Sequence, residues 1–320
     1  MTDGRFILAL AGGVGGGKLA HGLATALSPD ELAIVVNTAD DFVHLGLHIS
    51  PDVDSVLYAL ADCNDPERGW GLAGETWNFM DALERLGGET WFRLGDRDLA
   101  THVLRTQALA AGGTLSQATA LLARRLGIAH TIAPMSDGPV RSIVETDEGA
   151  LDFQDYFVRR QCQPKFRGVR FEGAASARPS EALRHALARA DAIVITPSNP
   201  FVSIDSILAL PGVAAALRQS RRPIVAVSPI VGGKALKGPL GKMMRERRLE
   251  PSPLGVARHY GELVNGWIID TTDRGYAPQI EALGCRVRVC DTVMRTPDDK
   301  AALARAAVEF AFELASEPVS

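Results

Sequence analysis

The stretch FILALAGGVGGGK, residues 6–18, decides the fold of this chain. Phe6–Ala11 is a short apolar run that ends in glycine, and Lys18–Leu27 has helical spacing, so the stretch predicts a strand, a turn and a helix. Backbone N–H groups and the helix dipole at such a turn favour phosphate. Five glycines in six positions exceed what a tight turn packed between strand and helix needs. We therefore expect phosphate or nucleotide contacts at Gly12, Gly13, Gly15, Gly16 and Lys18.

Two familiar nucleotide-binding patterns fit this turn incompletely. The run from Gly12 to Lys18 satisfies GxxxxGK, but Leu19 stands where a P-loop has the Ser or Thr that holds magnesium. Gly15 begins a GxGxxA pattern, but the second strand ends in Asn-Thr-Ala (37–39) without one clear ribose-binding acid. The turn therefore indicates a phosphate site of neither standard type.

Five further apolar runs read as buried strands, each with polar or turn residues at its carboxyl end. They are Leu32–Asn37, Ala192–Thr196, Ile224–Ser228, Gly266–Asp270 and Arg286–Val289. Helical stretches lie between several of them, a pattern typical of a parallel sheet with helices on both faces. We predict an α/β, Rossmann-like fold with a mainly parallel sheet, whose ligands bind beyond the carboxyl ends of the strands.

The middle of the chain has a different pattern. Pro139–Thr146 and Ala150–Phe157 alternate apolar and polar residues around Asp-Glu-Gly (147–149), which predicts a hairpin, and Arg167–Glu172 also alternates. Residues 137–177 are therefore expected to form a small, mainly antiparallel insertion between two parts of a Rossmann-like core, 1–136 and 178–320. Residues 52–126 are expected to be mostly helical, and Ala301–Leu314 is expected to be an amphipathic closing helix.

An acidic run follows the second strand and places four carboxylates, Asp40, Asp41, Asp52 and Asp54, within fifteen residues. Carboxylates beside a phosphate site can hold Mg²⁺ against a diphosphate, because magnesium prefers a few carboxylates plus phosphate oxygens. Asp41 and Asp54 are the candidate metal ligands. For Asp52 the alternative is a plain helix start, with Ser50 as the cap and Pro51 at the first helical position.

Two histidines and a charged cluster are further candidates. His44 and His48 lie four residues apart, but Gly46 between them indicates a loop, which favours ordinary polar contacts over a zinc site. The cluster Arg93–Asp98 (RLGDRD) mixes charges with glycine, as ligand-binding turns do, although a solvated turn is the alternative.

Two loops at strand ends complete the candidate site. Thr196–Phe201 (TPSNPF) is fixed by two prolines and presents Ser198 and Asn199 as nucleotide-binding groups. Ser228–Lys237 supplies flexible backbone and positive charge. We expect this loop and the stretch His44–His48 to supply polar groups to the ligand pocket.

Composition limits the class of protein. The net charge of −4 and the pI near 6.0 argue against a broad nucleic-acid-binding face. The four cysteines form no CxxC pair and are expected to be free thiols, as in a reducing compartment. The apolar stretch near the N-terminus is too short for a signal peptide, and no run of about 18 apolar residues would span a membrane. We expect a cytoplasmic protein.

Taken together, these motifs resemble the 2-phospho-L-lactate transferase family of coenzyme F-420 biosynthesis. The matching pieces follow one order along nearly the whole chain: AGGVGGGKL, VVNTADDFVHLGLHISPDVDSVLY, RLGDRDLATH, PMSDGPVRSIVETDEG, FQDYFV, TPSNPFVSIDSIL, AVSPIVGGKALKGP, and LGC with CDTVM. The opening loop departs from the family pattern, since many members carry Thr at the place of Val14 and Pro before the lysine.

The resemblance implies a magnesium-dependent transfer from lactyl-diphospho-guanosine to the alcohol 7,8-didemethyl-8-hydroxy-5-deazariboflavin, with release of GMP. The enolpyruvyl and 3-glyceryl donors are left open. It assigns the deazaflavin to Asp54 and Arg93, with Asp54 as the catalytic residue. Together with the several apolar helices, it also suggests a homodimer. A nicotinamide oxidoreductase and a non-enzymatic nucleotide-sugar sensor are the competing hypotheses.

Overall fold

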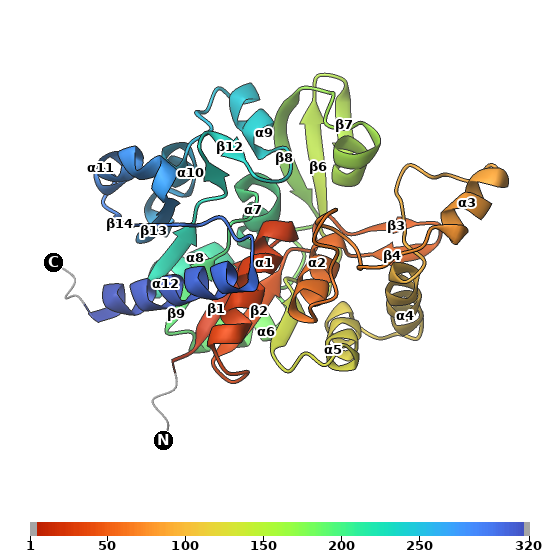
Figure 1. The fold of residues 1–320 in the computed structure, drawn as a ribbon, viewed down its shortest axis with the longest axis horizontal. Helices are drawn as coiled ribbons and strands as arrows, with labels where there is room; N and C mark the ends of the chain where they lie inside the picture. Colours follow the sequence, from red (N-terminus) through yellow and green to blue (C-terminus); the bar gives the residue numbers. More distant parts are fainter. Residues whose placement is uncertain (1–4, 317–320) are drawn as a thin grey trace.

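A computed structural model describes residues 5–316 of the chain (Figure 1). Its centre is a seven-stranded sheet in the order β14-β13-β10-β9-β1-β2-β5, in which every neighbouring pair is parallel. The strands are β1 Ile7–Ala11, β2 Leu32–Val36, β5 Thr131–Pro134, β9 Ala192–Ile195, β10 Ile224–Val227, β13 Gly266–Asp270 and β14 Arg286–Cys290. The predicted α/β, Rossmann-like class is confirmed, as are the six strands expected from the sequence.

The seventh strand, β5, was not predicted. It is short, begins with the exposed Thr131 and ends in Pro134. Proline lacks the N–H that a central strand must donate, so an apolar run that ends in proline is a weak strand signal. β5 lies at the edge of the sheet and pairs only with β2, where this deficit is tolerated.

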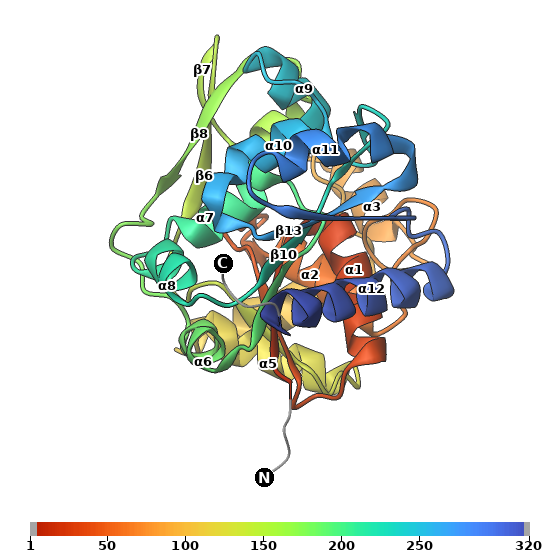
Figure 2. The same ribbon diagram turned by 90° about the vertical axis from the view of Figure 1, so that its left-hand side faces the viewer.

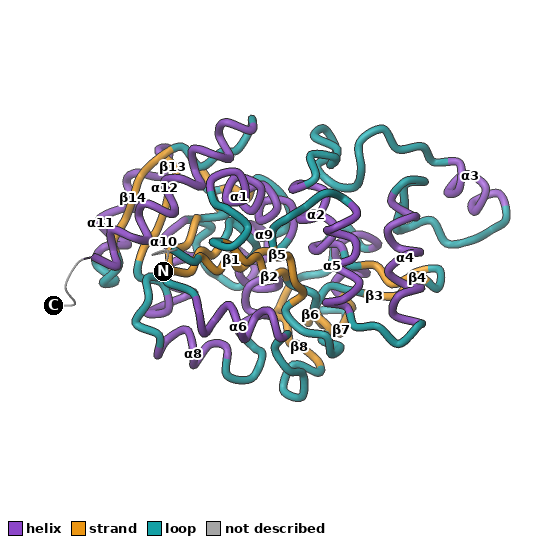
Figure 3. The backbone as a smooth tube through the Cα atoms, turned by 90° about the horizontal axis from the view of Figure 1, so that it is seen from below, coloured by secondary structure: helices purple, strands orange, loops and turns teal. Residues whose placement is uncertain are grey.

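Helices cover both faces of the sheet, as Figures 2 and 3 show from two directions. One layer holds α1 Gly13–Ala26, α2 Pro51–Leu60 and α12 Pro297–Ser316, and α1 packs against both of the others. The opposite layer includes α6 Glu181–Arg189, α7 Asp205–Leu208 and α8 Val213–Gln219. The predicted closing helix is confirmed as part of α12.

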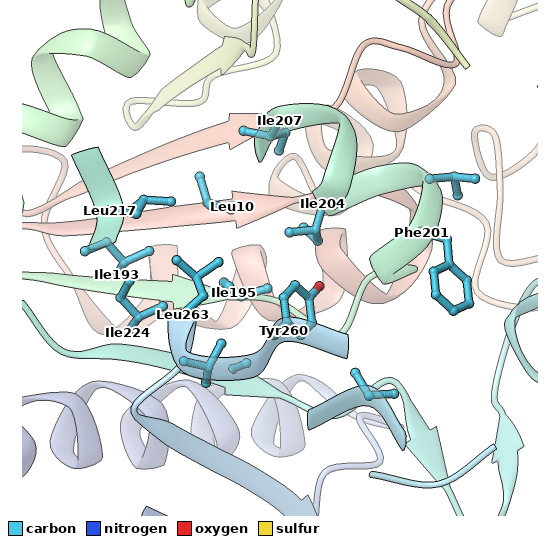
Figure 4. Close-up of a cluster of buried hydrophobic side chains, with 14 of the residues drawn as sticks. Leu10, Ile193, Ile195, Phe201, Ile204, Ile207, Leu217, Ile224, Tyr260 and Leu263 are labelled. Carbon is cyan, nitrogen blue, oxygen red and sulfur yellow. The ribbon is translucent and has the colours of Figure 1, made fainter. Parts of the chain in front are cut away.

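Alternation of side chains along each strand divides the hydrophobic core into two clusters. Ile7 and Ala9 of β1 pack with α1, α2 and α12, whereas Leu8 and Leu10 pack with the layer that contains α6 and α8. Figure 4 shows part of the second cluster, in which Leu10 and Ile193 lie close to Leu217. Strands buried on both faces must be apolar at every position, which is why the sequence shows continuous apolar runs here.

A separate antiparallel sheet, in the order β7-β6-β8, lies beside the parallel one. It consists of β6 Arg141–Thr146, β7 Gly149–Asp152 and β8 Phe166–Glu172. The predicted hairpin is confirmed, but its second strand ends at Asp152 and is followed by a π-helical turn, Asp155–Arg159. The domain limits 137–177 stay a prediction, because side chains of this region belong to the same hydrophobic cluster as the main sheet. The core ranges also include residues 1–4 and 317–320, which lie outside the described residues.

The stretch 52–126 is mostly helical, as expected: most of α2 is followed by α3 Asn78–Arg85, α4 Asp98–Ala110 and α5 Leu115–Arg125. The stretch His44–His48 is not the expected loop, because β3 Phe42–His44 and β4 Leu47–Ile49 form a hairpin whose turn has positive φ at Leu45 and Gly46. The remaining elements are β11 Ile230–Val231, β12 Lys234–Ala235, α9 Leu240–Glu246, α10 Pro253–Tyr260, α11 Ala277–Glu281, the 3₁₀ turns Gly261–Leu263 and Thr271–Tyr276, and the π-helical turn Pro200–Ile204.

No helix within residues 5–316 is long and apolar enough to cross a membrane by itself. Pro200–Leu208 and Val213–Gln219 meet the length and composition only when taken together, and they are bent by 83°.

Because the sheet is buried on both faces, truncating one of its side chains should cost far more stability than truncating an exposed side chain. Ile193 lies in β9 with 1% of its surface exposed. We expect Ile193→Ala to lower the free energy of unfolding by about 2–5 kcal/mol, because it leaves a cavity as well as removing apolar contact. Chemical denaturation measures this. Leu86, which is 86% exposed, is the control: Leu86→Ala should change stability by less than about 0.5 kcal/mol. Equal effects of the two changes would contradict this description of the core.

Candidate active site

The candidate site lies where the strand order reverses. From β1 the chain proceeds through β2 to β5 on one side, and β9, β10, β13 and β14 follow on the other. Ligands of open α/β sheets bind in the crevice at such a switch point, beyond the strand carboxyl ends. Here the end of β1 meets the end of β9: the Ser198 hydroxyl accepts a hydrogen bond from the Gly12 N–H at 2.9 Å and donates one to the Gly12 carbonyl at 2.8 Å.

The glycines after β1 allow this close approach. A Cβ on Gly12 would lie 2.4 Å from the Cβ of Ser203, and one on Gly15 would lie 2.4 Å from the Pro197 carbonyl oxygen. On Gly16 it would meet the Ser198 hydroxyl at 2.8 Å. The helix α1 begins at Gly13, earlier than expected, so most of the predicted loop forms its first turns. The glycine content therefore has a packing cause in addition to any ligand contact.

A cavity of about 690 Å³ opens at this point. Most of the residues singled out in the sequence line it: Gly12, Gly13, Gly15, Lys18, Asp54, Arg93, Ser198 and Asn199. Among the described residues that form its wall, Gly16 and Asp41 are not found. The Asn199 side chain accepts a hydrogen bond from the Phe201 N–H at 3.0 Å and so begins the following turn.

Positive charge collects beside the glycine turn. The Lys18 ammonium donates to the Met294 carbonyl at 2.9 Å. Burial lowers the pKa of Lys18, and the neighbouring charges of Lys300 and Lys237 lower it further. Lys237 also lines the main cavity, and Lys300 lines a small pocket that shares Lys18 with it. Three ammonium groups this close repel one another, and a multiply charged anion would relieve that repulsion.

Asp54, one turn into α2, is buried and makes a bidentate ion pair with Arg105 of α4. Burial alone would lower the pKa of Arg105, but the charge and hydrogen bond of Asp54, with smaller contributions from Asp41 and Tyr58, together more than offset it and the net shift is upward. The guanidinium of Arg105 is therefore held charged. Asp54 can accept a hydrogen bond inside the cavity, and Arg105 fixes its orientation.

The ion pair continues into a buried network on one face of α4. The His102 ring lies 3.6 Å from Asp54 and 3.3 Å from Asp98, and Tyr58 donates a hydrogen bond to Asp98. Although burial would raise the pKa of Asp98, the hydrogen bond and charge of His102 lower it. Ligand atoms of Asp54, Asp98 and His102 lie within 4.8 Å of one another, as in a metal site.

Asp41 has other partners. Its carboxylate accepts a hydrogen bond from Ser50 at 2.6 Å and lies 3.2 Å from His48. Ser50 therefore does not cap α2 with its side chain, although Pro51 takes the first helical position as predicted. His44 belongs to an aromatic cluster with Trp91, at 5.2 Å between ring centroids. The two histidines thus have different partners, and neither is among the residues that line the cavity.

Asp40 and Asp52 line the cavity floor. The Asn37 side-chain amide donates to both carboxylates at 2.9 Å. Burial raises the pKa of Asp52 to about 6, against hydrogen bonds from Asn37, the Gly13 backbone and Ser203. Burial also raises the pKa of Asp40 well above its usual value, and the charge of Asp52 adds to this.

The cluster Arg93–Asp98 has a divided role. Asp96 accepts hydrogen bonds from Thr76 and Asn78, and Glu75 accepts from the backbone N–H groups of Arg97 and Asp98 at the start of α4. This part holds a turn. Arg93 instead lines the cavity and lies over the Trp77 ring at 4.3 Å, and the cavity wall nearby contains Trp91, Phe92 and Phe157.

Residues 7–298 match the model of the family described as 2-phospho-L-lactate transferase CofD. The chain belongs to this family. A phosphoenolpyruvate transferase of Streptomyces griseus subsp. griseus is 40% identical over 314 residues, covering 96% of this chain and 99% of that protein. A 2-phospho-L-lactate transferase of Methanosarcina acetivorans is 40% identical over 298 residues, covering 93% and 96%. The resemblance expected from the motifs is confirmed.

A solved structure, a member of the UPF0052 family from Bacillus halodurans, superposes with a TM-score of 0.63 at 17% identity, covering 96% of this chain and 100% of that one. At this identity the likeness shows the fold alone.

Sequence reasoning missed the network behind Asp54 in this CofD-family chain. Asp98, His102 and Arg105 have spacings of four and three residues, which place them on one face of a helix. This signal was visible within RLGDRDLATH and the residues that follow. That Arg105 pairs with Asp54, 51 positions earlier, could be seen only in the fold.

The Asp54–Arg105 pair predicts strong energetic coupling. We expect Arg105→Met to lower the free energy of unfolding by about 3–5 kcal/mol, because it leaves Asp54 buried without its counter-charge. Adding Asp54→Asn should restore much of that stability. Denaturant unfolding of the two single variants and the double variant measures the coupling. Strictly additive losses would show that the two side chains do not act as a pair.

Proposed function

We propose that this protein transfers a phospholactyl group, or a related phospho-acid, from a guanosine diphosphate-linked donor to the deazaflavin alcohol 7,8-didemethyl-8-hydroxy-5-deazariboflavin. GMP is released, and the reaction belongs to coenzyme F-420 biosynthesis. The proposal includes Mg²⁺ as the cofactor and a homodimer in the cytoplasm as the working form. One observation carries it: a single cavity joins a glycine turn, a lysine cluster and buried carboxylates in a member of the CofD family.

The reaction breaks one phosphorus–oxygen bond of the donor's diphosphate and forms another. The acceptor's ribityl hydroxyl attacks the phosphorus that bears the acid, loses its proton, and GMP leaves with the bonding electron pair. Such a transfer depends on positioning and on neutralising charge more than on covalent catalysis. The cavity offers both kinds of group.

The donor's diphosphate is assigned to the glycine turn and the lysines. The backbone of Gly12, Gly13 and Gly15 borders the cavity at the start of α1, where N–H groups and the helix dipole favour anions. Lys18 and Lys237 border the same space. Ser198 and Asn199, at the end of β9, would contact the nucleotide from the other side of the switch point.

The acceptor is assigned to the opposite part of the cavity. Asp54 would accept a hydrogen bond from the attacking hydroxyl, in an orientation fixed by Arg105. Arg93 and the aromatic side chains Trp91 and Phe92 suit a planar heteroaromatic ring, since aromatic rings stack on one another and on guanidinium groups. A bound Mg²⁺ would neutralise the phosphate charge that develops during transfer.

The identity of the donor acid depends on which groups surround it. His44 and His48 are absent from the described cavity wall, so the expected contribution of that stretch is not supported. The Ser228 hydroxyl is already engaged with the Ile230 backbone, at 2.9 Å to the carbonyl and 3.2 Å from the N–H. Nearby wall residues are Pro229, Val231 and Leu236. Such an apolar wall separates close isosteres by only about 1–3 kcal/mol, so we propose phospholactate with acceptance of enolpyruvate and 3-phosphoglycerate.

A competition experiment tests the function. The purified protein receives the deazaflavin alcohol, Mg²⁺ and the lactyl, enolpyruvyl and glyceryl donors at equal concentration, and products are read by mass spectrometry. We expect a phospholactyl product together with smaller amounts of the other two. A product of one other acid alone would overturn the phospholactate assignment. If no donor gave a deazaflavin phosphodiester, the transferase function itself would fail.

The lysine cluster gives a separate prediction for nucleotide binding. We expect Lys18→Met to weaken GDP binding about tenfold or more, because a charge-assisted contact worth roughly 1.5–3 kcal/mol is lost while the side-chain volume is nearly kept. Calorimetry measures the affinity. Lys165 is exposed and outside the cavity wall, so Lys165→Met is the matched control and should bind GDP as the wild type does. Unchanged affinity in Lys18→Met would move the diphosphate away from this cluster.

A further inference from the structure

Residues 64–72, which follow α2 and which we call the strap, form a loop closed on itself at the rim of the cavity. An antiparallel bridge joins its first residue to its last, and the Arg68 guanidinium donates to the Leu72 carbonyl at 2.7 Å. Residues 68–71 line the cavity, and Trp70 among them is still 43% exposed. The strap therefore forms part of the wall where the cavity opens to solvent.

The backbone of the strap meets the side of the cavity to which the diphosphate is assigned. The Lys237 ammonium donates to the Arg68 carbonyl at 3.4 Å. Gly69 has a φ of 78°, and a Cβ there would lie 3.0 Å from Lys237 Nζ and 4.0 Å from the Cγ1 of Val14 in the glycine turn. The strap thus lies directly against both the lysine and the turn.

The side chains of the strap meet the side to which the acceptor is assigned. The Arg68 guanidinium lies over the Trp70 ring at 5.5 Å and over the Trp77 ring at 5.2 Å. The opposite neighbour of Trp77 is Arg93, whose guanidinium lies over the same ring at 4.3 Å and lines the cavity. Cation–π contacts of this kind hold the charged groups in place on the rings. One tryptophan therefore joins the strap to Arg93.

The chemistry of Lys237 allows it to serve the strap and a ligand together. An ammonium group has three N–H donors, and the contact with the Arg68 carbonyl uses one of them. That contact is long and exposed, so it holds the strap only weakly. Diphosphate oxygens in the cavity would accept from the remaining donors and fix the ammonium. The strap would then be fixed with it.

We propose that Lys237 and the strap couple the binding of the two substrates. The donor's diphosphate fixes Lys237, Lys237 fixes the strap, and the strap holds Trp70 and Arg93 in place for the ring of the acceptor. Lys237 and Arg68 are positioning residues in this scheme. The identities of donor and acceptor rest on the proposed function, but the response of the strap to a diphosphate does not.

The competing explanation is that the strap is positioned by its own hydrogen bonds. The Gly69 N–H donates to the Asp65 carbonyl and the Asp65 N–H donates to the Gly71 carbonyl, both at 3.0 Å. These bonds give the loop its shape, but they lie within it and attach it neither to the glycine turn nor to Lys237. If they alone positioned the strap, a diphosphate would change neither its mobility nor the affinity for the acceptor.

Calorimetry measures the coupling without turnover. The full-length protein is titrated with the deazaflavin alcohol, first alone and then at saturating GDP. For the wild type we expect GDP to tighten binding of the alcohol about fivefold or more, and the alcohol must then tighten GDP binding by the same factor. In Lys237→Met, with GDP raised to saturation, the factor should fall below about twofold.

Lys234→Met is the matched control. Lys234 is exposed and lies in the same loop as Lys237, but it is outside the described cavity wall. The control removes one positive charge from the loop in the same way and should keep the wild-type coupling factor.

Trypsin, which cleaves after arginine, reports on the strap itself. The rate of cleavage between Arg68 and Gly69 is followed by mass spectrometry with and without GDP. Since cleavage depends on how often the loop opens, GDP should slow it about fivefold or more in the wild type and in Lys234→Met. In Lys237→Met at saturating GDP, the rate should change less than about twofold.

The outcomes separate the coupling from the proposed function. The coupling is overturned if GDP leaves the wild-type affinity for the alcohol unchanged, if Lys237→Met keeps the wild-type factor, or if Lys234→Met loses it as well. Coupling in a protein that transfers no group supports the strap and contradicts the proposed function. A protein that binds no deazaflavin alcohol also contradicts that function. In that case GDP protection of Arg68 that requires Lys237 still supports the strap, and its absence overturns the strap too.

Discussion

The close approach of β1 and β9 at the switch point is the constraint on which the site depends. One hydroxyl, that of Ser198, makes two hydrogen bonds to the backbone of Gly12 and joins the two strand ends. The approach leaves no room for a Cβ at Gly12 or Gly15, because each would lie 2.4 Å from a neighbouring atom. The same glycines leave backbone uncovered at the start of α1. Packing and anion binding therefore require the same residue at the same positions.

The fold class could be predicted because each strand of a parallel sheet covered on both faces appears in the sequence as a run of consecutive apolar residues. β2 is buried at every position, and its five residues are all apolar. The edge strand β5 has a weaker sequence signal, since it begins with an exposed threonine and ends with a proline. The hairpin of β3 and β4 was missed for another reason: its turn uses a positive φ at Leu45, where a glycine or asparagine would have signalled it.

The sequence could predict which segments form the candidate site, because that depends only on the topology of the sheet. Carboxyl ends of parallel strands meet at one edge, so Lys18, Asp54 and Ser198 were expected to lie together, and they line one cavity. Side-chain partners across the chain were not predictable. Nothing near Asp54 in the sequence indicates that it pairs with Arg105, and nothing near Asp41 indicates that it contacts His48 and does not line the cavity. Such pairings are set by the packing of α4 and the hairpin against α2 and its preceding segment.

Residue type and position in the sequence therefore did not determine what each acid does. Asp40 and Asp41 are adjacent in the sequence, yet Asp40 lines the cavity with Asp52, whereas Asp41 contacts Ser50 and His48 and does not line it. The contacts of Asp41 with Ser50 and His48 are compatible with a purely structural role. Asp40 and Asp52 instead share one neutral amide, that of Asn37. Asp40 and Asp41 each keep one buried oxygen without a hydrogen-bond partner among the described residues. The place of each acid relative to the cavity, and not its residue type, therefore determines which carboxylates a ligand can reach.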